Sequence, residues 1–228
     1  MRNSPSVHPK SVSLSYDIGL FELAATPNVT PAARYKGSSE LGKVGTFVGY
    51  GKTGTGLTGA TSFDGQKRAG QNIIDAAFVD TGGQKKWRVF GSDFDSPAGN
   101  TNCWGSSSPL DLEYLVSFGD SGGDVFIEEN GKSYLAGIHS FLADYNRNDV
   151  WGDYGDYSGH MRVSVFNSWI DSIISGTGKK GRGNANLDLE DFLSNNTAAV
   201  PEPATLGLLA LGAIGLLRRR PFGLDRGR

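Results

Sequence analysis

Short apolar runs separated by turn-forming residues recur along most of this chain, and they constrain its fold more than any other feature. Between two such runs, Asn130-Gly131 is the strongest short signal for a β-hairpin. Glycine supplies 33 of 228 residues without a collagen-like period, so we interpret the glycines as turns and tight backbone positions. Many short strands with few helices predict an all-β barrel or sandwich. The runs lie at 18–23, 43–50, 73–79, 86–90, 125–127 and 134–138.

The segments between these runs have the composition of loops and connectors. Residues 24–43 are predicted to be a connector, and 51–59, 92–108 and 143–160 to be loops. Residues 161–166 fit one more strand or the entry to a helix, and Asn167–Ile174 is the one plausible helix near the end of the fold. From residue 176 the composition shifts to Gly, Lys, Asn, Ser and Thr, which predicts a linker over 176–199.

The C-terminal segment combines three features in order. Pro201-Glu202-Pro203 is followed by an uncharged run at 204–217 and then by Arg218-Arg219-Arg220. Fourteen residues as a helix reach about 21 Å, which is short of a ~30 Å hydrocarbon core and leaves a buried core helix as the alternative. The run is apolar on every face and ends in an arginine cluster typical of a cytoplasmic membrane flank, so we expect membrane insertion or sorting.

Charge and cysteine content exclude several classes of site. The chain carries 22 basic and 24 acidic residues, and removing the basic tail 201–228 leaves a net charge of −5 on residues 1–200. Such a balance argues against nucleic acid as a partner. Cys103 is the single cysteine, so neither an intrachain disulfide nor a cysteine-based zinc site can form, and we interpret it as structural. No cofactor is expected.

The N-terminus offers no targeting signal. Residues 1–10 are polar and lack an apolar stretch, so the chain either stays inside the cell or has lost its true start. The C-terminal segment favours the second interpretation.

The sharpest chemical motif is Gly119-Asp120-Ser121-Gly122-Gly123. Small residues around a serine allow a tight turn whose N–H groups converge on one point, where they can stabilise an oxyanion in acyl transfer. The bland alternative is a glycine-rich turn with an incidental serine. The letters also fit the Gly-x-Ser-x-Gly elbow of α/β-hydrolases, with an Asp among 144–156 and His160 downstream in the right order. That fold needs a helix after the serine, whereas a hairpin is predicted here, so it is the runner-up.

Two family resemblances organise these features. The tail resembles the PEP-CTERM sorting signal of Gram-negative bacteria, which implies export, recognition by an exosortase and cleavage near Pro201–Pro203. It also implies a transient membrane anchor through 204–217 and later residence at the cell surface or in the extracellular matrix. Residues 7–174 resemble a trypsin-like (chymotrypsin-fold) serine protease. The motifs that carry this second resemblance are 16–23, 48–51, 119–123, 135–141 and 162–170.

The protease resemblance implies an all-β, double Greek-key barrel whose first barrel is incomplete. Residues 1–35 would be the remnant of that first barrel and 36–175 the second barrel with its short closing helix. The linker, the sorting and membrane segment at 200–220 and a tail at 221–228 would follow.

The same resemblance implies roles for individual residues. Ser121 would be the nucleophile of a serine endopeptidase acting on polypeptides, and Asp17 would be the carboxylate that orients the base. The N–H groups of Gly119 and Ser121 would form the oxyanion hole. Other implied roles are an ion pair between Asp120 and a freed N-terminus, Ser140 beside Asp17, and Leu115 at the base of the primary specificity pocket, which argues against a Lys or Arg preference.

The histidine that must take the serine proton is the main departure from the family pattern. His8 precedes Pro9 and is expected on a surface loop, His139 should point away from the face of Ser140 because the two are neighbours on a strand, and His160 lies in a polar region. Two interpretations stay open. Either an N-terminal piece with the histidine and a signal peptide is missing, leaving a fragment with little activity, or the chain is a non-catalytic surface-displayed β-barrel binding module.

A metal site is not expected. Residues 144–149 partly match a calcium loop but lack its glycine at the sixth position and its acid at the twelfth, so a surface loop is the better interpretation.

Overall fold

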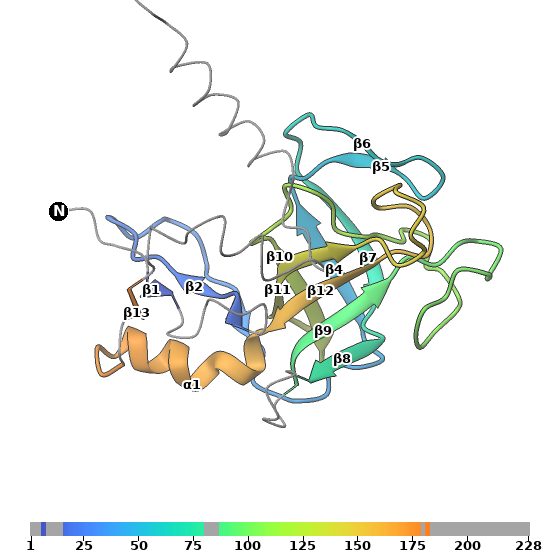
Figure 1. The fold of residues 1–228 in the computed structure, drawn as a ribbon. Helices are drawn as coiled ribbons and strands as arrows, with labels where there is room; N and C mark the ends of the chain where they lie inside the picture. Colours follow the sequence, from blue (N-terminus) through green and yellow to red (C-terminus); the bar gives the residue numbers. More distant parts are fainter. Residues whose placement is uncertain (1–5, 8–15, 80–86, 179–180, 183–228) are drawn as a thin grey trace, which may run out of the picture.

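A computed structural model describes residues 6–7, 16–79, 87–178 and 181–182 of the chain (Figure 1). Strands dominate, and α1 is the single α-helix of the described residues, so the all-β prediction is confirmed. The elements are β1 (Ser6–Val7), β2 (Gly19–Leu20), β3 (Ala33–Arg34), β4 (Val44–Gly49), β5 (Thr53–Thr55), β6 (Gly59–Ser62), β7 (Arg68–Ile73), β8 (Ala76–Val79), β9 (Trp87–Asp93), β10 (Asp124–Glu129), β11 (Lys132–Ala143), β12 (Tyr157–Arg162), α1 (Val163–Ile174) and β13 (Gly181–Arg182).

One large sheet carries most of the fold. Its strands run in the order β7-β4-β10-β11-β12-β9-β8, with antiparallel neighbours throughout, and β3 pairs in parallel with β11. Figure 1 shows this sheet curling on itself. A second small sheet has the order β13-β1-β2, and β5 pairs with β6 as a separate hairpin.

The β10–β11 hairpin forms where the sequence predicts it. Asn130 and Gly131 both adopt positive φ, at 53° and 70°, which is the conformation that a tight two-residue hairpin turn needs. β11 is 12 residues long and pairs with β10 on one side and β12 on the other. Its register against β12 shifts between His139 and Phe141, so Ser140 is the extra residue of a β-bulge.

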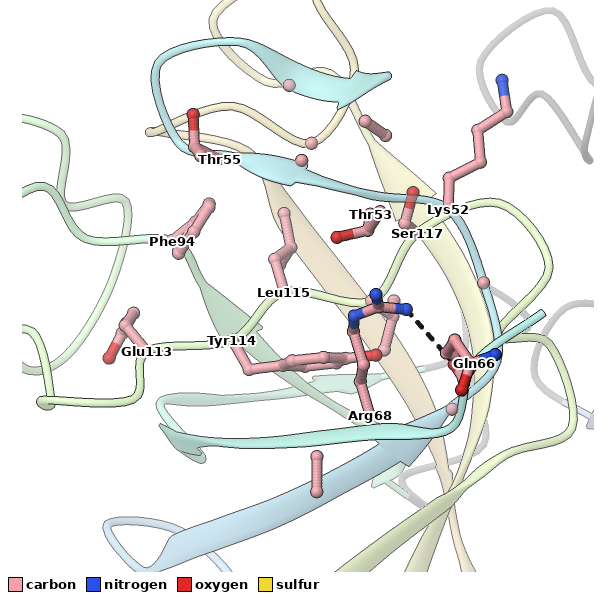
Figure 2. A pocket seen from close by; sticks show the side chains of 18 residues that line it. Lys52, Thr53, Thr55, Gln66, Arg68, Phe94, Glu113, Tyr114, Leu115 and Ser117 are labelled. Atoms are coloured by element: carbon pink, nitrogen blue, oxygen red, sulfur yellow. Dashed lines mark hydrogen bonds between the residues drawn. The ribbon is translucent and has the colours of Figure 1, made fainter. Parts of the chain in front are cut away.

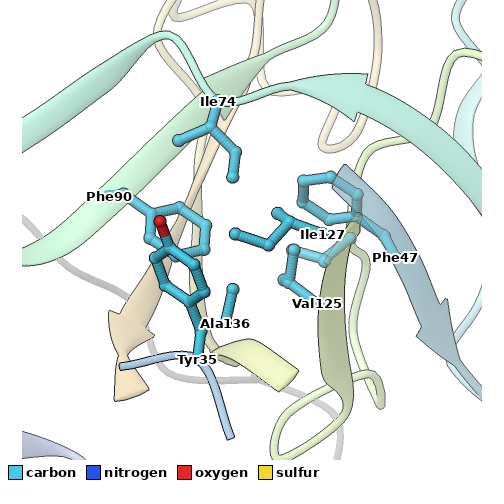
Figure 3. Packing of buried hydrophobic residues seen from close by; sticks show 8 residues of the cluster. Tyr35, Phe47, Ile74, Phe90, Val125, Ile127 and Ala136 are labelled. Atoms are coloured by element: carbon cyan, nitrogen blue, oxygen red, sulfur yellow. The ribbon is translucent and has the colours of Figure 1, made fainter. Parts of the chain in front are cut away.

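The main core lies inside the curl of the sheet (Figure 3). Alternate residues of β4 and β10 point into it, as the period of two in a half-buried strand requires. Ile127 is 1% exposed and Val125 is fully buried. The core comprises Tyr35, Phe47, Ile74, Phe90, Val116, Val125, Ile127 and Ala136.

A second core joins α1 to the sheet. Val163, Phe166 and Ile170 form a buried stripe at helical spacing and pack with Met161 of β12. Tyr16 and Ile18, which flank Asp17, belong to the same core. The aspartate therefore sits on a segment that is held to the body of the protein by buried neighbours on both sides.

The sequence predictions missed structure in two segments. Residues 51–59, predicted to be a loop, contain β5 and the start of β6. The connector 24–43 contains β3 and the fully buried Glu40. The Glu40 carboxylate accepts hydrogen bonds from Arg162 Nη2 at 2.6 Å and from Ser164 Oγ at 2.6 Å, so the connector is fastened to the start of α1.

Several sequence predictions fall outside the described residues. These are most of the 176–199 linker, the segment 200–220 and the tail 221–228. Over the residues that the structure does describe, no helix combines the length and the apolar character needed to cross a membrane.

The main core predicts a large cost for truncation at β10. Ile127→Ala removes a buried side chain at the centre of the curled sheet and should lower the free energy of unfolding by about 3 kcal/mol. Leu57→Ala, at a side chain that is 86% exposed, is the matched control and should change it by less than about 0.5 kcal/mol. Denaturant unfolding measures both, and equal effects of the two substitutions would contradict this assignment of the core.

Candidate active site

The loop that carries Ser121 connects the core segment ending at Ser117 to β10. Gly119 and Gly122 adopt φ of 96° and 81°, which disfavours side chains larger than glycine there. Ser121 itself is exposed. The strand β10 begins directly after Gly123, so the helix that an α/β-hydrolase elbow needs is absent at this point, and the runner-up fold is wrong.

Backbone hydrogen bonds fasten this loop to β11. Gly122 N–H donates to the His139 carbonyl at 3.0 Å, and His139 N–H donates to the Gly123 carbonyl at 2.8 Å. A Cβ at Gly123 would lie 2.5 Å from the Val48 carbonyl oxygen, so no larger residue fits there without a backbone shift. The exposed Ser121 is therefore one residue away from a doubly hydrogen-bonded junction with His139.

Asp17 reaches the next residue of the same strand. Ser140 Oγ donates to Asp17 Oδ2 at 2.8 Å, although 123 positions separate the two residues in the sequence. Ser140 is the extra residue of the β-bulge, and the side chain of its neighbour His139 points into the core. The structure thus brings the Ser121 loop and Asp17 to consecutive residues of β11. The catalytic roles of Ser121, Asp17, Gly119 and Ser140 stay predictions.

Asp120 is buried beside the nucleophile candidate and accepts three hydrogen bonds. Gly51 N–H donates to Oδ1 at 2.6 Å, and Ser117 N–H and the Tyr114 hydroxyl donate to Oδ2 at 2.8 and 3.0 Å. A Cβ at Gly49 would lie 1.8 Å from Oδ1, so the Gly-aromatic-Gly stretch 49–51 makes the space that this carboxylate fills. The ion pair expected with a freed N-terminus stays a prediction.

The two described histidines form one buried hydrogen-bonded chain. His139 Nε2 lies 3.2 Å from the Val48 carbonyl oxygen, the Nδ1 atoms of His139 and His160 are 3.0 Å apart, and His160 Nε2 is 3.1 Å from Ser158 Oγ. A carbonyl only accepts, so we assign a proton to His139 Nε2, which leaves its Nδ1 to accept from His160 Nδ1–H. His160 Nε2 then accepts from the Ser158 hydroxyl.

All the hydrogen bonds of this row of histidines can form only when both imidazole rings are neutral. Burial lowers the pKa of His139 to about 4 and holds the pKa of His160 well below its ordinary value. Every lone pair of both imidazoles is already used, so neither ring is available to take the proton of Ser121. His8 lies outside the described residues.

Leu115 lines a pocket of about 260 Å³ (Figure 2). Its walls come from β5, β6, β7 and the segment 113–117, and they include Arg68 and Tyr114. Ser121, Asp17 and Ser140 do not line this pocket. The specificity role of Leu115 stays a prediction.

Sequence reasoning did not identify a cluster of partly and fully buried carboxylates, one of which, Glu113, lines the same pocket as Leu115. Burial is the first cause that raises the pKa of Asp75 and of Glu113 to about 7 and that of Asp95 to about 6, and neighbouring carboxylates add to each shift. Backbone donors hold two of these groups, since Ser106 N–H donates to Asp75 and Leu110 N–H to Glu113. Spacing offered no signal for this cluster, because its members come from three separate segments.

The described residues contain no group of three or more His, Cys, Asp or Glu side chains placed to hold a metal ion. The 144–149 loop is cross-linked by its own side chains instead, with Asp144 accepting from the N–H groups of Arg147 and Asp149. Burial raises the pKa of the Cys103 thiol to about 12, so it stays protonated at neutral pH and is a poor nucleophile.

The neutral histidine chain predicts a specific loss of stability in acid. An unfolded histidine binds a proton near pH 6.5 and folded His139 only near pH 4, so acidification through this window favours unfolding by about 3 kcal/mol. In His139→Gln this loss should disappear, so the stability gap between the wild type and the variant should narrow from pH 7 to pH 4. Unfolding free energies measured across this range check it, and an NMR titration that places the His139 pKa near 6.5 would contradict it.

Comparison with known proteins supports the architecture and the C-terminal signal separately. Residues 199–220 match the model of the PEP-CTERM protein-sorting motif. Among solved structures, the chain is similar to neuropsin, a serine protease expressed in the limbic system of mouse brain, with a TM-score of 0.50 and 16% identity over 76% of this chain and 71% of that one. No curated protein matches the chain in sequence. The chain therefore has the chymotrypsin-like fold of the trypsin-like serine proteases and carries a PEP-CTERM sorting motif at residues 199–220.

Proposed function

We propose that this chain is the nucleophile-bearing part of an exported serine endopeptidase of the trypsin-like class. Ser121 attacks the peptide carbonyl to form an acyl-enzyme, and the N–H groups of Gly119 and Ser121 stabilise the oxyanion. Asp17 orients the histidine base, with Ser140 holding the carboxylate in place. The observation that carries the proposal is the convergence of the Ser121 loop and Asp17 on His139 and Ser140 of β11.

The base itself has to come from outside the described residues. Both described histidines are locked in a neutral chain, and their positions in the core exclude contact with a substrate. This observation also favours the second candidate function, a non-catalytic β-barrel that binds a partner at the cell surface. The two candidates differ in whether Ser121 can be made reactive.

A fluorophosphonate probe separates these candidates. The 228-residue chain should label slowly, since neither described histidine can take the proton of Ser121, while a version lengthened at its N-terminus by the residues encoded upstream should label at least about a hundredfold faster. Ser121→Ala should abolish this labelling. Ser107→Ala, at another exposed loop serine, is the matched control and should leave it intact. A lengthened protein that folds and fails to label would favour the binding module.

The PEP-CTERM motif supports export and sorting in a Gram-negative bacterium. In the proposed route the apolar segment 204–217 enters the membrane, the arginine cluster 218–220 stays on the cytoplasmic side, and an exosortase cleaves near Pro201–Pro203. The body of the protein is then released to the cell surface.

The sorting route predicts a change in mass and location. In a host with an active exosortase, the mature protein should lose the residues after about position 203 and leave the membrane fraction. In a host lacking the exosortase the uncleaved chain should accumulate in the membrane. Mass spectrometry of both fractions measures this, and an uncleaved protein at the surface of the first host would contradict the route.

A further inference from the structure

We propose that the hydroxyl of Tyr114 is a positioning group that holds the Ser121 loop in place through its hydrogen bond to Asp120. In this role it replaces the freed N-terminus that the family resemblance implies as the partner of Asp120. The inference rests on the proposed function, because it concerns the regulation of the same site. It implies that the oxyanion loop is assembled when the chain folds, without a proteolytic activation step.

The first argument is the completeness of the Asp120 hydrogen bonding. Asp120 is 3% exposed, and its two carboxylate oxygens share three donors at 2.6 to 3.0 Å. Hydrogen bonds to a charged acceptor are worth more than neutral ones, and a buried carboxylate left without them is costly. Two of the donors are backbone N–H groups, so among the described residues Tyr114 supplies the one side-chain donor.

The second argument is the rigidity of Tyr114. Its N–H donates to the Gln71 carbonyl at 2.9 Å, and its carbonyl accepts from Asn72 Nδ2 at 2.9 Å, so β7 holds the backbone at both polar atoms. The ring packs against the main core, with its centroid 6.2 Å from that of Phe47. The contacts with β7 and with the main core therefore hold the hydroxyl beside Asp120 before any substrate binds.

The third argument is the path from the phenol to the reacting atoms. Asp120 directly precedes Ser121, and its carbonyl accepts from Gly123 N–H at 2.8 Å, which closes the turn. Its side chain also fixes Ser117 N–H and Gly51 N–H, on the two segments that flank the loop. Tyr114 and Ser117 both line the pocket shown in Figure 2.

Hydrogen exchange on the full chain tests the positioning role without using activity. In Tyr114→Phe the amides of Gly51 and Ser117 should exchange at least about tenfold faster than in Tyr134→Phe. Tyr134 is the matched control, because it is also a half-buried tyrosine packed on the main core while its hydroxyl does not hold Asp120. Unchanged exchange at both amides, or equal acceleration in the two variants, would overturn the inference.

Probe labelling of the lengthened protein then tests the regulatory consequence. Tyr114→Phe should lower the maximal labelling rate at least about tenfold with little change in the probe concentration that gives half of it. Trimming the N-terminus of the wild type should not raise the rate. If the lengthened protein labels only after trimming, this inference fails while the proposed function stands. If it never labels, the proposed function fails, and the exchange data alone decide the positioning role of Tyr114.

Discussion

The site depends on the two hydrogen-bonded junctions at His139 and Ser140 of β11. At His139 the backbone holds the Ser121 loop through Gly122 and Gly123, and at Ser140 the side chain holds Asp17. β11 lies in the middle of the large sheet, between β10 and β12. Pairing with strands on both sides fixes the position of β11. The Ser121 loop and Asp17 lie outside the sheet, and their contacts with β11 fix their positions in turn.

Two neighbouring residues of β11 contact opposite faces of the sheet. Neighbouring side chains of a strand alternate between its faces, so a buried His139 leaves Ser140 on the opposite face. His139 enters the core and lies within hydrogen-bond distance of Val48 and His160, while Ser140, the extra residue of the β-bulge, donates to Asp17. A packing requirement inside the barrel and a polar contact outside it are thereby met by consecutive residues.

Local sequence signals predicted the fold well where turn chemistry is strict, and poorly where long-range contacts decide. Asn130-Gly131 located the β10–β11 hairpin because few dipeptides tolerate two positive φ angles. The 24–43 connector gave no such signal, and Glu40 is fully buried there because Arg162 and Ser164, over 120 positions away, supply its partners. α1 was expected over 167–174 and begins at Val163, since the change from strand to helix after Arg162 is decided by packing of Val163 and Phe166.

The candidate site likewise has some residues that local sequence signals predicted and others that only long-range contacts bring together. The glycine-rich motif marked Ser121 and Asp120, and family resemblance placed Ser140 beside Asp17, a contact present in the structure. The donors to Asp120 and the pairing of His139 with His160 were not predictable from spacing. Both arise from segments that meet only in the folded sheet, namely the Tyr114 segment with the nucleophile loop, and β11 with β12.

The buried ionisable groups act on stability in opposite directions across one pH range. The histidine chain favours the folded state at neutral pH and loses that contribution as pH falls from about 6.5 toward the His139 pKa of about 4. Asp75 and Glu113 have folded pKa values of about 7, above their ordinary values, so they penalise the folded state at neutral pH and this penalty is relieved by the same acidification. The two groups offset each other between about pH 4 and pH 6.5.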